Sequence, residues 1–370
     1  MRYRWQQSRA RGRLRRHRQW VAQTEYAVID LGTNSCRMLI ARPLNASGAS
    51  ADFTVVDGFS RIVRLGEGLA HSGRLSRAAM ARTIEALAVC AGRINARNTA
   101  HVRCVATEAC RRATNGETFA ERVARETGLK LEIIQPEREA ELTLTGCTPL
   151  IGVGRDRAIL LDIGGGSTEI QWVEVPRSGD RLLSLRSRDV ISLPFGVVTL
   201  ADEFGTGPMS DTVYREILGR TAGEIERFSA RNEIQDYVAA GRVQMIGTSG
   251  TVTTLGAMHL GLQRYDRSRV DGLSIDFQRI RALSAQLFEL DLDARAKIPC
   301  VGPGRADLML MGCALLSGVI GQWPIGQLRI ADRGIREGLL GEMIREFEPA
   351  QPAPRSGPER AAPLSALAAI

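Results

Sequence analysis

The stretch LDIGGGSTEI, from Leu161 to Ile170, places three consecutive glycines between an aspartate and a Ser-Thr-Glu cluster. An apolar run leads directly into it, as expected for a buried strand. Glycine has no Cβ atom, so three glycines in succession leave bare backbone against which another group can lie. Successive backbone N–H groups without side chains form a concavity that binds anions. The stretch therefore predicts a strand that ends in an anion-binding turn.

A second copy of the pattern lies near the start of the chain. The segment DLGTNS, Asp30–Ser35, matches DIGGGS, Asp162–Ser167, at its Asp, Gly and Ser positions. Each copy follows one apolar stretch and precedes another, which is typical of a β-hairpin with small residues in its turn. Repetition at domain-length spacing indicates that a whole fold was duplicated, because solenoid repeats are only about 20–50 residues long. The sequence therefore predicts an α/β protein in which two duplicated domains face each other across a cleft.

Helices and strands are expected to alternate after each hairpin. Ser76 is placed to cap a helix, Gly128 to end another and Pro136 to open a third. The apolar run Leu308–Gly321 is too short for a membrane span, so a buried helix is expected there. The predicted organisation is a disordered Arg-rich tail over 1–24, one domain over 25–136, a second over 137–334, a helix over about 335–348 that packs back on the first domain, and a disordered Pro/Ala-rich tail over 349–370.

Three glycine segments carry candidate phosphate-binding groups. The third, IGTSGTVTTLG at Ile246–Gly256, follows an expected strand and opens a helix, whose N-terminal amides attract anions. Neither a GxxxxGKS/T sequence nor a GxGxxG sequence of the dinucleotide-binding type is present. A plain hairpin turn, and a helix start capped by Thr248 or Ser249, remain open as alternatives. The candidate phosphate-binding residues from these segments are Gly32, Thr33, Asn34, Ser35, Gly164, Gly165, Gly166, Ser167, Thr168, Gly250 and Thr251.

Acidic residues flank the first two glycine turns. Asp30, Asp162 and Glu169 supply hard oxygen ligands of the kind that Mg²⁺ prefers. Mg²⁺ also keeps waters and bridges to phosphate oxygens, so carboxylates beside two anion-binding turns describe a cleft for a phosphoanhydride. These three acids are therefore the candidate metal ligands. The expected cofactor is Mg²⁺, with a monovalent cation as a further candidate.

The charge distribution separates the N-terminal tail from the rest of the chain. The 370 residues have a net charge of +8, and residues 1–24 contain eight arginines and no acid. Since basic and acidic residues balance in the remainder, the overall charge does not indicate a nucleic-acid groove in the folded part. The tail is expected to be a solvated arm that can contact RNA or polyphosphate non-specifically. Seven scattered cysteines and the lack of a signal or membrane segment predict reduced thiols, a cytoplasmic location and no membrane contact.

Seven segments along the chain point to one family. They are VIDLGTNSCRMLIAR, VRLGEGL, VATEACRRATN, EIIQPEREAELTLTG, LDIGGGSTEI, IGTSGTVTTL and IADRGIREG. In this order they resemble the exopolyphosphatase/guanosine pentaphosphate phosphatase family, from about Tyr26 to Phe347. The resemblance implies two actin-like (ribonuclease H-like) domains of the actin, hexokinase and Hsp70 superfold. It also implies hydrolysis of a terminal phosphoanhydride in the cleft, assisted by Mg²⁺.

The resemblance also implies roles for single residues. It places the catalytic carboxylate at Glu139, in the segment EREAEL, and a phosphate-contacting arginine at Arg111. It places the acids beside the second glycine turn at Asp162 and Glu169. Arg138 stands where the family often has an acid and is expected to influence the pKa of Glu139. Larger members carry a further C-terminal helical domain, for which no counterpart is expected here.

Three functions remain open at this point. The leading one is a hydrolase that releases terminal phosphate from inorganic polyphosphate, from pppGpp, or from both, with Glu139 activating the attacking water. The second is a phosphotransferase of the same superfold that uses polyphosphate or a nucleotide. The third is a non-catalytic sensor that binds polyphosphate or pppGpp. The choice of substrate and the formation of a homodimer also stay open.

Overall fold

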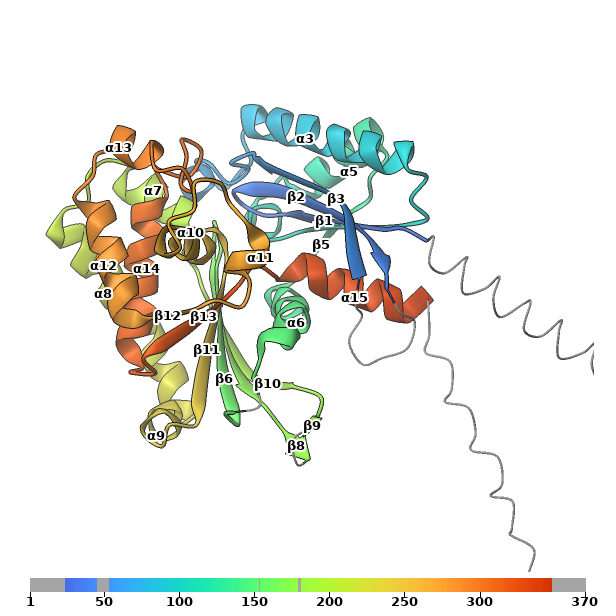
Figure 1. Cartoon of the computed structure of the whole chain (residues 1–370). Coiled ribbons are helices and arrows are strands. Elements are labelled where there is room, and N and C mark those ends of the chain that lie inside the picture. The colour runs from blue at the N-terminus through green and yellow to red at the C-terminus, as the bar shows by residue number, and fades with distance from the viewer. Residues whose placement is uncertain (1–23, 45–52, 153, 179–180, 348–370) are drawn as a thin grey trace, which may run out of the picture.

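The computed structural model describes residues 24–44, 53–152, 154–178 and 181–347. Two mixed β-sheets are flanked by helices and lie side by side, as Figure 1 shows. The two predicted tails lie outside the described residues, apart from Thr24. In the described ranges, no helix combines the length and the apolar character needed to cross a lipid bilayer.

The first domain is built on one sheet. Its elements are β1 (Tyr26–Leu31), β2 (Ser35–Pro43), β3 (Phe53–Ile62), α2 (Leu69–Ser72), α3 (Arg77–Ala96), β4 (His101–Ala106), α4 (Glu108–Arg112), α5 (Gly116–Thr127) and β5 (Leu131–Ile133). The strand order is β3-β2-β1-β4-β5. The first three strands are antiparallel neighbours, whereas β4 runs parallel to β1 and β5 parallel to β4. Apolar residues of α3 and α5 join those of β1 and β2 in one core on one face of the sheet.

The second domain repeats this order in a larger sheet. Its elements are β6 (Arg157–Ile163), β7 (Thr168–Glu174), β8 (Arg177–Ser178), β9 (Arg181–Leu182), β10 (Arg186–Leu193), α7 (Val197–Phe204), α8 (Asp211–Arg231), α9 (Ile234–Ala239), β11 (Val243–Thr248), α10 (Gly250–His259), α11 (Arg267–Val270), β12 (Ser274–Asp276), α12 (Phe277–Phe288), α13 (Leu292–Ala296), α14 (Met309–Gln322) and β13 (Gln327–Ala331). The strand order is β10-β7-β6-β11-β13-β12, and β8 pairs with β9 separately. The hairpin β6-β7 thus takes the place of β1-β2, and the predicted duplicated α/β fold is confirmed.

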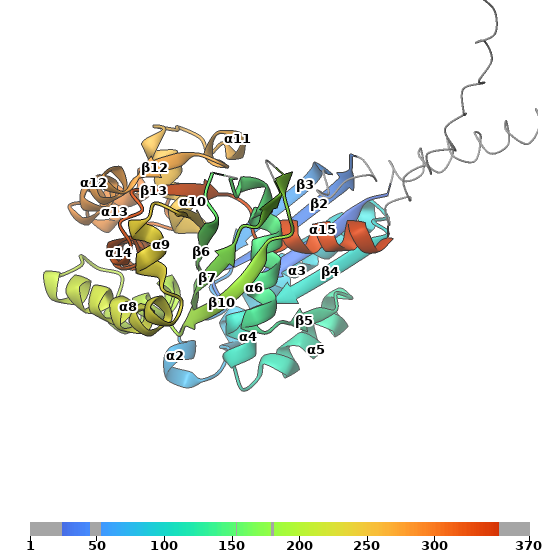
Figure 2. The ribbon, with the colours of Figure 1, turned by 90° about the horizontal axis from the view of Figure 1, so that it is seen from below.

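Two helices lie where the domains meet. They are α6 (Pro136–Cys147), which is followed by the 3₁₀ turn Thr148–Leu150, and α15 (Ile335–Phe347), and they cross each other in Figures 1 and 2. Their backbones touch, because a Cβ atom at Gly338 would lie only 2.0 Å from the carbonyl oxygen of Leu142. Leu339 and Leu340 of α15 share one core with Val28 of β1, so α15 covers the second face of the first sheet.

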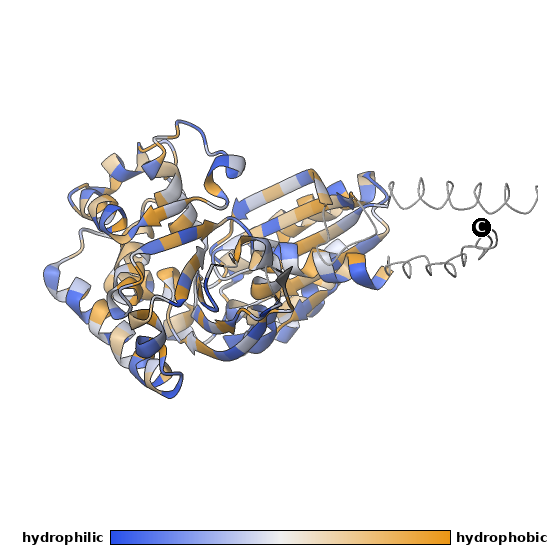
Figure 3. Ribbon diagram, turned by 60° about the horizontal axis from the view of Figure 1, so that its bottom comes forward, coloured by the Kyte–Doolittle hydropathy of each residue, from blue (hydrophilic) through white to orange (hydrophobic). Residues whose placement is uncertain are grey.

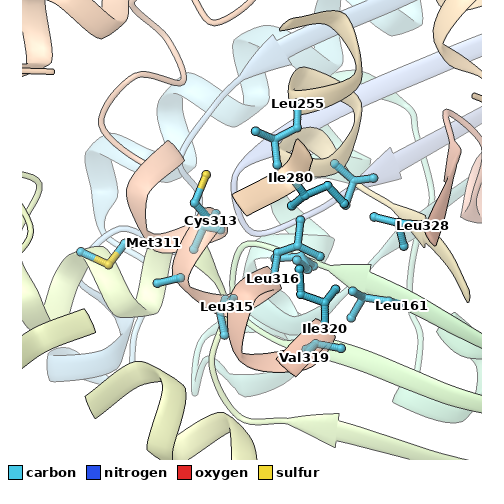
Figure 4. Packing of buried hydrophobic residues seen from close by; sticks show 14 of the residues in the cluster. Leu161, Leu255, Ile280, Met311, Cys313, Leu315, Leu316, Val319, Ile320 and Leu328 are labelled. Carbon is cyan, nitrogen blue, oxygen red and sulfur yellow. The ribbon is translucent and has the colours of Figure 1, made fainter. Parts of the chain in front are cut away.

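The core of the second domain surrounds α14. Residues 309–320 of this helix are all buried, so the expected buried helix is confirmed. Figure 4 shows its side chains packed with Leu161 of β6, Leu255 of α10 and Ile280 of α12. Each buried Leu or Ile side chain contributes about 1.5–3 kcal/mol. Figure 3 shows the corresponding pattern over the fold, with hydrophobic residues inside and hydrophilic residues outside. This core fixes β6, the strand that leads into the glycine turn.

Candidate active site

The two hairpin turns have the same hydrogen bond. The amide of Gly32 donates to the carbonyl oxygen of Ser35 at 2.9 Å in the first turn. The amide of Gly164 donates to the carbonyl oxygen of Ser167 at 2.9 Å in the second. The duplicated hairpins therefore end in equivalent turns, one on each domain.

The two turns contact each other across the cleft. A Cβ atom at Gly165 would lie 2.9 Å from Cβ of Thr33, and one at Gly166 would lie 2.7 Å from Cγ of Glu108. Both distances are shorter than side chains tolerate, so any larger residue would push the domains apart. The missing side chains of the glycine run therefore permit the close approach of the two domains, in addition to any role in binding an anion.

A cavity of about 160 Å³ lies between the turns and the N-terminus of α10. It is bounded by both domains and by α6, and each of these elements brings predicted residues to it. The sequence-predicted residues that line it are Asp30, Gly32, Thr33, Asn34, Ser35, Glu139, Asp162, Gly164, Gly165, Gly166, Ser167, Gly250 and Thr251. Segments from opposite ends of the chain thus meet in one site.

Three predicted residues lie behind the cavity rather than on its surface. Arg111 donates to the backbone oxygen of Ile134 at 2.6 Å, and its guanidinium lies 3.2 Å from a carboxylate oxygen of Glu139. The buried hydroxyl of Thr168 donates to the backbone oxygen of Phe195 at 3.0 Å. Glu169 is also buried and accepts a hydrogen bond of 2.9 Å from the hydroxyl of Ser192, a residue of β10. All three side chains are thus engaged by other protein groups, next to the residues that line the cavity.

Arg111, rather than Arg138, is the arginine beside the proposed base. It also pairs with Glu108 at 2.8 Å, so it bridges two acids at the end of the cavity. Arg138 instead pairs with Glu141 at 3.2 Å and with Glu342 of α15. Within the described ranges, Arg138 therefore makes no ion pair with Glu139 through which it could influence the pKa of that residue in the expected way.

Burial and mutual repulsion raise the pKa of the carboxyl groups at this site. Burial, and then the charge of Glu169, raises the pKa of Glu139 well above its usual range, although Arg111 opposes this. The same two causes raise the pKa of Asp162 to about 7. Burial also raises the pKa of Asp30 and of Glu169. The site therefore gathers negative charge that a cation can compensate.

The carboxylates fit Mg²⁺ by their chemistry. Asp30 and Asp162 line the cavity with hard oxygen donors, and Arg37 is the cation that lowers the pKa of both. Within the described residues, no three His, Cys, Asp or Glu side chains form a complete metal site on their own. Mg²⁺ is commonly held by one or two carboxylates and completes its shell with waters and phosphate oxygens, so this donor set suits it.

Sequence reasoning missed the arginines of the cavity. Arg37, Arg305, Arg333 and Arg336 all line it. Arg37 lies two residues after Ser35 on β2, and residues two apart on a strand face the same side, so this signal was present in the sequence. Arg305 lies in the loop before α14, where no local pattern marks a binding residue, and Arg336 lies in α15, within the segment IADRGIREG. Guanidinium groups recognise phosphate oxygens well, so these residues suit a polyanionic substrate.

Comparison with known proteins identifies the family. Residues 44–347 match the model of the Ppx/GppA phosphatase family. The putative exopolyphosphatase of Haemophilus influenzae is 30% identical over 330 residues, which is 88% of this chain and 93% of the relative. Exopolyphosphatase 2 of Mycobacterium tuberculosis is 29% identical over 86% of this chain and 98% of its own length. The guanosine-5′-triphosphate,3′-diphosphate pyrophosphatase of Aeromonas hydrophila is 29% identical over 85% of this chain, which spans 58% of that relative.

Solved structures share the fold. The Aquifex aeolicus member of the Ppx/GppA protein family superposes with a TM-score of 0.68 at 27% identity, over 88% of this chain and 98% of that chain. An exopolyphosphatase from Cytophaga hutchinsonii superposes with a TM-score of 0.74 at 23% identity, over 87% and 98%. The family model covers most of the sequence, and the two-domain fold is that of the solved members. The chain therefore belongs to the Ppx/GppA phosphatase family.

Proposed function

We propose that this protein releases orthophosphate from the end of inorganic polyphosphate, from the 5′ end of pppGpp, or from both, with Glu139 as the base. Its family members are hydrolases of phosphoric anhydrides, which is the enzyme class of this chain. The M. tuberculosis and A. hydrophila relatives are named for polyphosphate and for the guanosine nucleotide, respectively. Both substrates end in the same chemical group, a terminal phosphoanhydride.

The position of Glu139 is the observation that carries this proposal. Its side chain is buried in the first turn of α6 and lines the same cavity as both glycine turns. A terminal phosphate held by the turn amides and the N-terminus of α10 would therefore lie within the same small volume as a carboxylate. Phosphoryl transfer to water requires this combination of positioning, charge neutralisation and a base.

The proposed reaction is a single attack of water on the terminal phosphate. The oxygen of a water attacks the terminal phosphorus, one of its protons passes to Glu139, and the bridging P–O bond breaks. The products are orthophosphate and a chain that is one phosphate shorter. Arg37 and Arg305 would neutralise the charge of the shortened chain as it leaves. General-base assistance of this kind contributes about 10²–10⁴-fold to the rate.

We propose that Mg²⁺ binds beside the second turn. Asp162 and Asp30 would bind the ion in the cavity. Glu169, which is paired with Asp162 across β6 and β7, would help to orient that aspartate. When bound, it would withdraw charge from the phosphate oxygens. The carboxylates would in turn be kept ionised by the metal, which offsets the repulsion among them.

Phosphate release by the purified protein tests the proposed function. Release is measured side by side on short polyphosphate, long polyphosphate, pppGpp and ATP, with Mg²⁺ present. A hydrolase releases free orthophosphate from at least one of the first three. Transfer of the phosphate to an added nucleotide without free release would instead establish the phosphotransferase, and binding without turnover would establish the sensor.

We also propose that the Arg-rich segment over 1–24 contacts RNA or long polyphosphate. This segment lies outside the described residues except for Thr24, and its eight arginines equal the net charge of the whole chain. Contacts between arginine and phosphate release counterions, so such binding depends steeply on salt.

A further inference from the structure

One short segment links the first phosphate turn to the second domain. The segment Val63–Gly68, with the sequence VRLGEG, follows β3 and precedes α2. The amides of Val63 and Arg64 both donate to the carbonyl oxygen of Asn34, at 2.9 and 3.0 Å. The amide of Gly66 donates to the carbonyl oxygen of Thr33 at 2.9 Å. These bonds hold the two residues at the tip of the first turn.

Gly66 shows how closely this segment fits the turn. A Cβ atom at this position would lie 2.3 Å from the methyl group of Thr33, so only glycine fits without displacement. Arg82 of α3 holds the segment from the other side, because its Nε donates to the carbonyl oxygen of Val63 at 3.1 Å. Movement of the segment would therefore move the turn with it.

The same segment contacts the second domain at two points. The guanidinium of Arg64 lies 2.7 Å from the carboxylate of Asp307, in the loop before α14. The amide of Gly68 donates to the carboxylate of Asp202, on α7, at 2.9 Å. These contacts join the domains through residues outside α6 and α15. They fix the position of one domain on the other.

Asp307 carries the connection to the opposite wall of the cavity. It lies two residues after Arg305, whose side chain lines the cavity. The carboxyl group of Asp307 is 10% exposed, and in the described part of the chain its Oδ1 makes no hydrogen bond, while its Oδ2 forms the ion pair with Arg64. A chain of contacts thus runs from Asn34 through Arg64 and Asp307 to the loop of Arg305.

The backbone of Arg64 is held in an unfavourable conformation. Its φ angle is +48°, in the left-handed region that a residue with a Cβ atom rarely adopts. Such strain persists only where the surrounding structure imposes it, and it is concentrated at functional sites. In this segment the two backbone hydrogen bonds to Asn34 hold the strained residue in place, and its side chain pairs with Asp307.

We propose that Arg64 and Asp307 are a positioning pair that couples closure of the two domains to the geometry of the phosphate site. A phosphate chain would bind between the domains, and enzymes whose site lies between domains commonly close around their substrate, so that contacts between the domains form at closure. When Arg64 pairs with Asp307, the first turn and the loop of Arg305 are held in a fixed relative position on opposite walls of the cavity. The pair acts through Thr33, Asn34 and Arg305 and does not touch the reacting atoms. Only the kinetic part of this proposal rests on the proposed hydrolysis.

Kinetics with tripolyphosphate test the pair. Arg64→Ala and Asp307→Asn are each expected to raise KM about 5- to 30-fold, with kcat within a few-fold of the native value, because the closed form is less populated. Arg64→Lys should recover part of the loss. The double variant should be no worse than the more affected single variant, since both remove the same contact. A loss in the double variant that equals the product of the single losses would contradict the pair.

A matched ion pair within the first domain provides the control. Arg93 lies 3.1 Å from Asp57 and is 42% exposed, close to the 37% of Arg64, but it does not reach the second domain. Arg93→Ala should leave KM within about twofold of the native value, while both variants lower the melting temperature by similar small amounts. If Arg64→Ala and Arg93→Ala have the same KM, Arg64 has only a structural role.

A distance between the domains separates this proposal from the proposed function. All seven native cysteines are buried, so probes can be attached selectively at Glu121→Cys on α5 and Glu224→Cys on α8, which are both exposed. Arg64→Ala is expected to lengthen and broaden the distance distribution without ligand, and tripolyphosphate should narrow it again. This result would stand even if no substrate were hydrolysed. An unchanged distribution would overturn the positioning pair and leave the hydrolase intact.

Discussion

Arg37 occupies in the first hairpin the position that Glu169 occupies in the second. Asp30 is the register partner of Arg37 across β1 and β2, and Asp162 is the register partner of Glu169 across β6 and β7. The first hairpin therefore pairs an aspartate with an arginine, whereas the second pairs an aspartate with a glutamate. This difference concentrates negative charge on the second domain, which is where we propose that Mg²⁺ binds.

Replacement of Arg37 should make the site harder to ionise. The charge of Arg37 lowers the pKa of both Asp30 and Asp162, so Arg37→Gln is expected to raise both. Protons then compete more strongly with Mg²⁺, and phosphate release at pH 6 should fall about 3- to 10-fold more than release at pH 8. Rates of phosphate release measured from pH 5.5 to 8.5 at several Mg²⁺ concentrations would reveal this pH-dependent loss. Arg61→Gln, an exposed arginine on β3, is the control, and equal pH profiles for the two variants would refute the assignment.

Glu139→Gln tests the proposed base directly. The amide keeps the shape of the side chain but cannot accept a proton, so kcat should fall about 10²–10⁴-fold with little change in KM. Glu137→Gln and Glu141→Gln are the controls, because both residues are exposed on the same helix and should remain within a few-fold of the native rate. An active Glu139→Gln enzyme would assign water activation to another group.

Arg111 is expected to act through Glu139 and not through the substrate. Its guanidinium is engaged by Glu108, Glu139 and a backbone oxygen, and its charge lowers the pKa of Glu139. Arg111→Met should therefore raise that pKa and shift the acid limb of kcat to higher pH, with about a 10-fold loss near pH 7. The exposed neighbour Arg112→Met is the control. A rise in KM at constant kcat would mean that Arg111 binds phosphate directly.

Local features of the fold were predictable because neighbouring residues determine them. The hydroxyl of Ser76 accepts a hydrogen bond from the amide of Ala79 at the start of α3, as expected for an N-cap. Gly128 ends α5 with a φ angle of 74°, a conformation that suits glycine. The glycine turns and the repeat of the hairpin could likewise be predicted from the sequence, because each depends on a few adjacent residues.

Strand alternation explains why the side chain of Thr168, a candidate phosphate-binding residue, does not line the cavity. Side chains along a strand alternate between the two faces, so Thr168 shares a face of β7 with Ile170 and Trp172, which lie in the core. Its position next to three glycines suggested a phosphate donor, but alternation directs it inward. Glu169 then faces the other side of the sheet, toward α6.

Contacts between distant segments were not predictable from one sequence. Nothing near Gly166 indicates that its partner is Glu108, and nothing near Arg305 indicates a cavity. These contacts depend on how the two domains meet, which local patterns do not encode. Arg37 is an exception, since alignment of the two hairpins gives it the position equivalent to that of Glu169.

Deletion of residues 1–24 tests the Arg-rich segment. The truncated protein should hydrolyse short polyphosphate at the native rate, while its binding to RNA or long polyphosphate weakens and loses most of its salt dependence. Deletion of residues 349–370 is the control of similar length. If both truncations have the same salt slope as the full chain, the arginines make no phosphate contacts.

The carboxyl group of Asp162 should make the stability of the metal-free protein depend on pH. Burial and Glu169 raise its pKa in the fold to about 7 from an ordinary 3.8. Since the folded value is the higher one, the contribution of the protonated group is complete below about pH 4 and is lost as the pH rises through about 7. At about 1.36 kcal/mol per pH unit, this difference corresponds to at most about 4 kcal/mol, shared with the neighbouring acids.

Asp162→Asn should remove this dependence, because the amide keeps the shape and carries no charge. Urea unfolding in EDTA is expected to show that the native protein loses stability between pH 5 and pH 8, and that the variant loses less. Addition of Mg²⁺ at pH 8 should then stabilise the native protein and not the variant, because only the native site retains the charged ligand. The same substitution should lower turnover in saturating Mg²⁺ by about 10²-fold or more. Equal pH slopes in EDTA would show that the pKa of Asp162 is not raised in the fold, whereas equal stabilisation by Mg²⁺ would place the metal elsewhere.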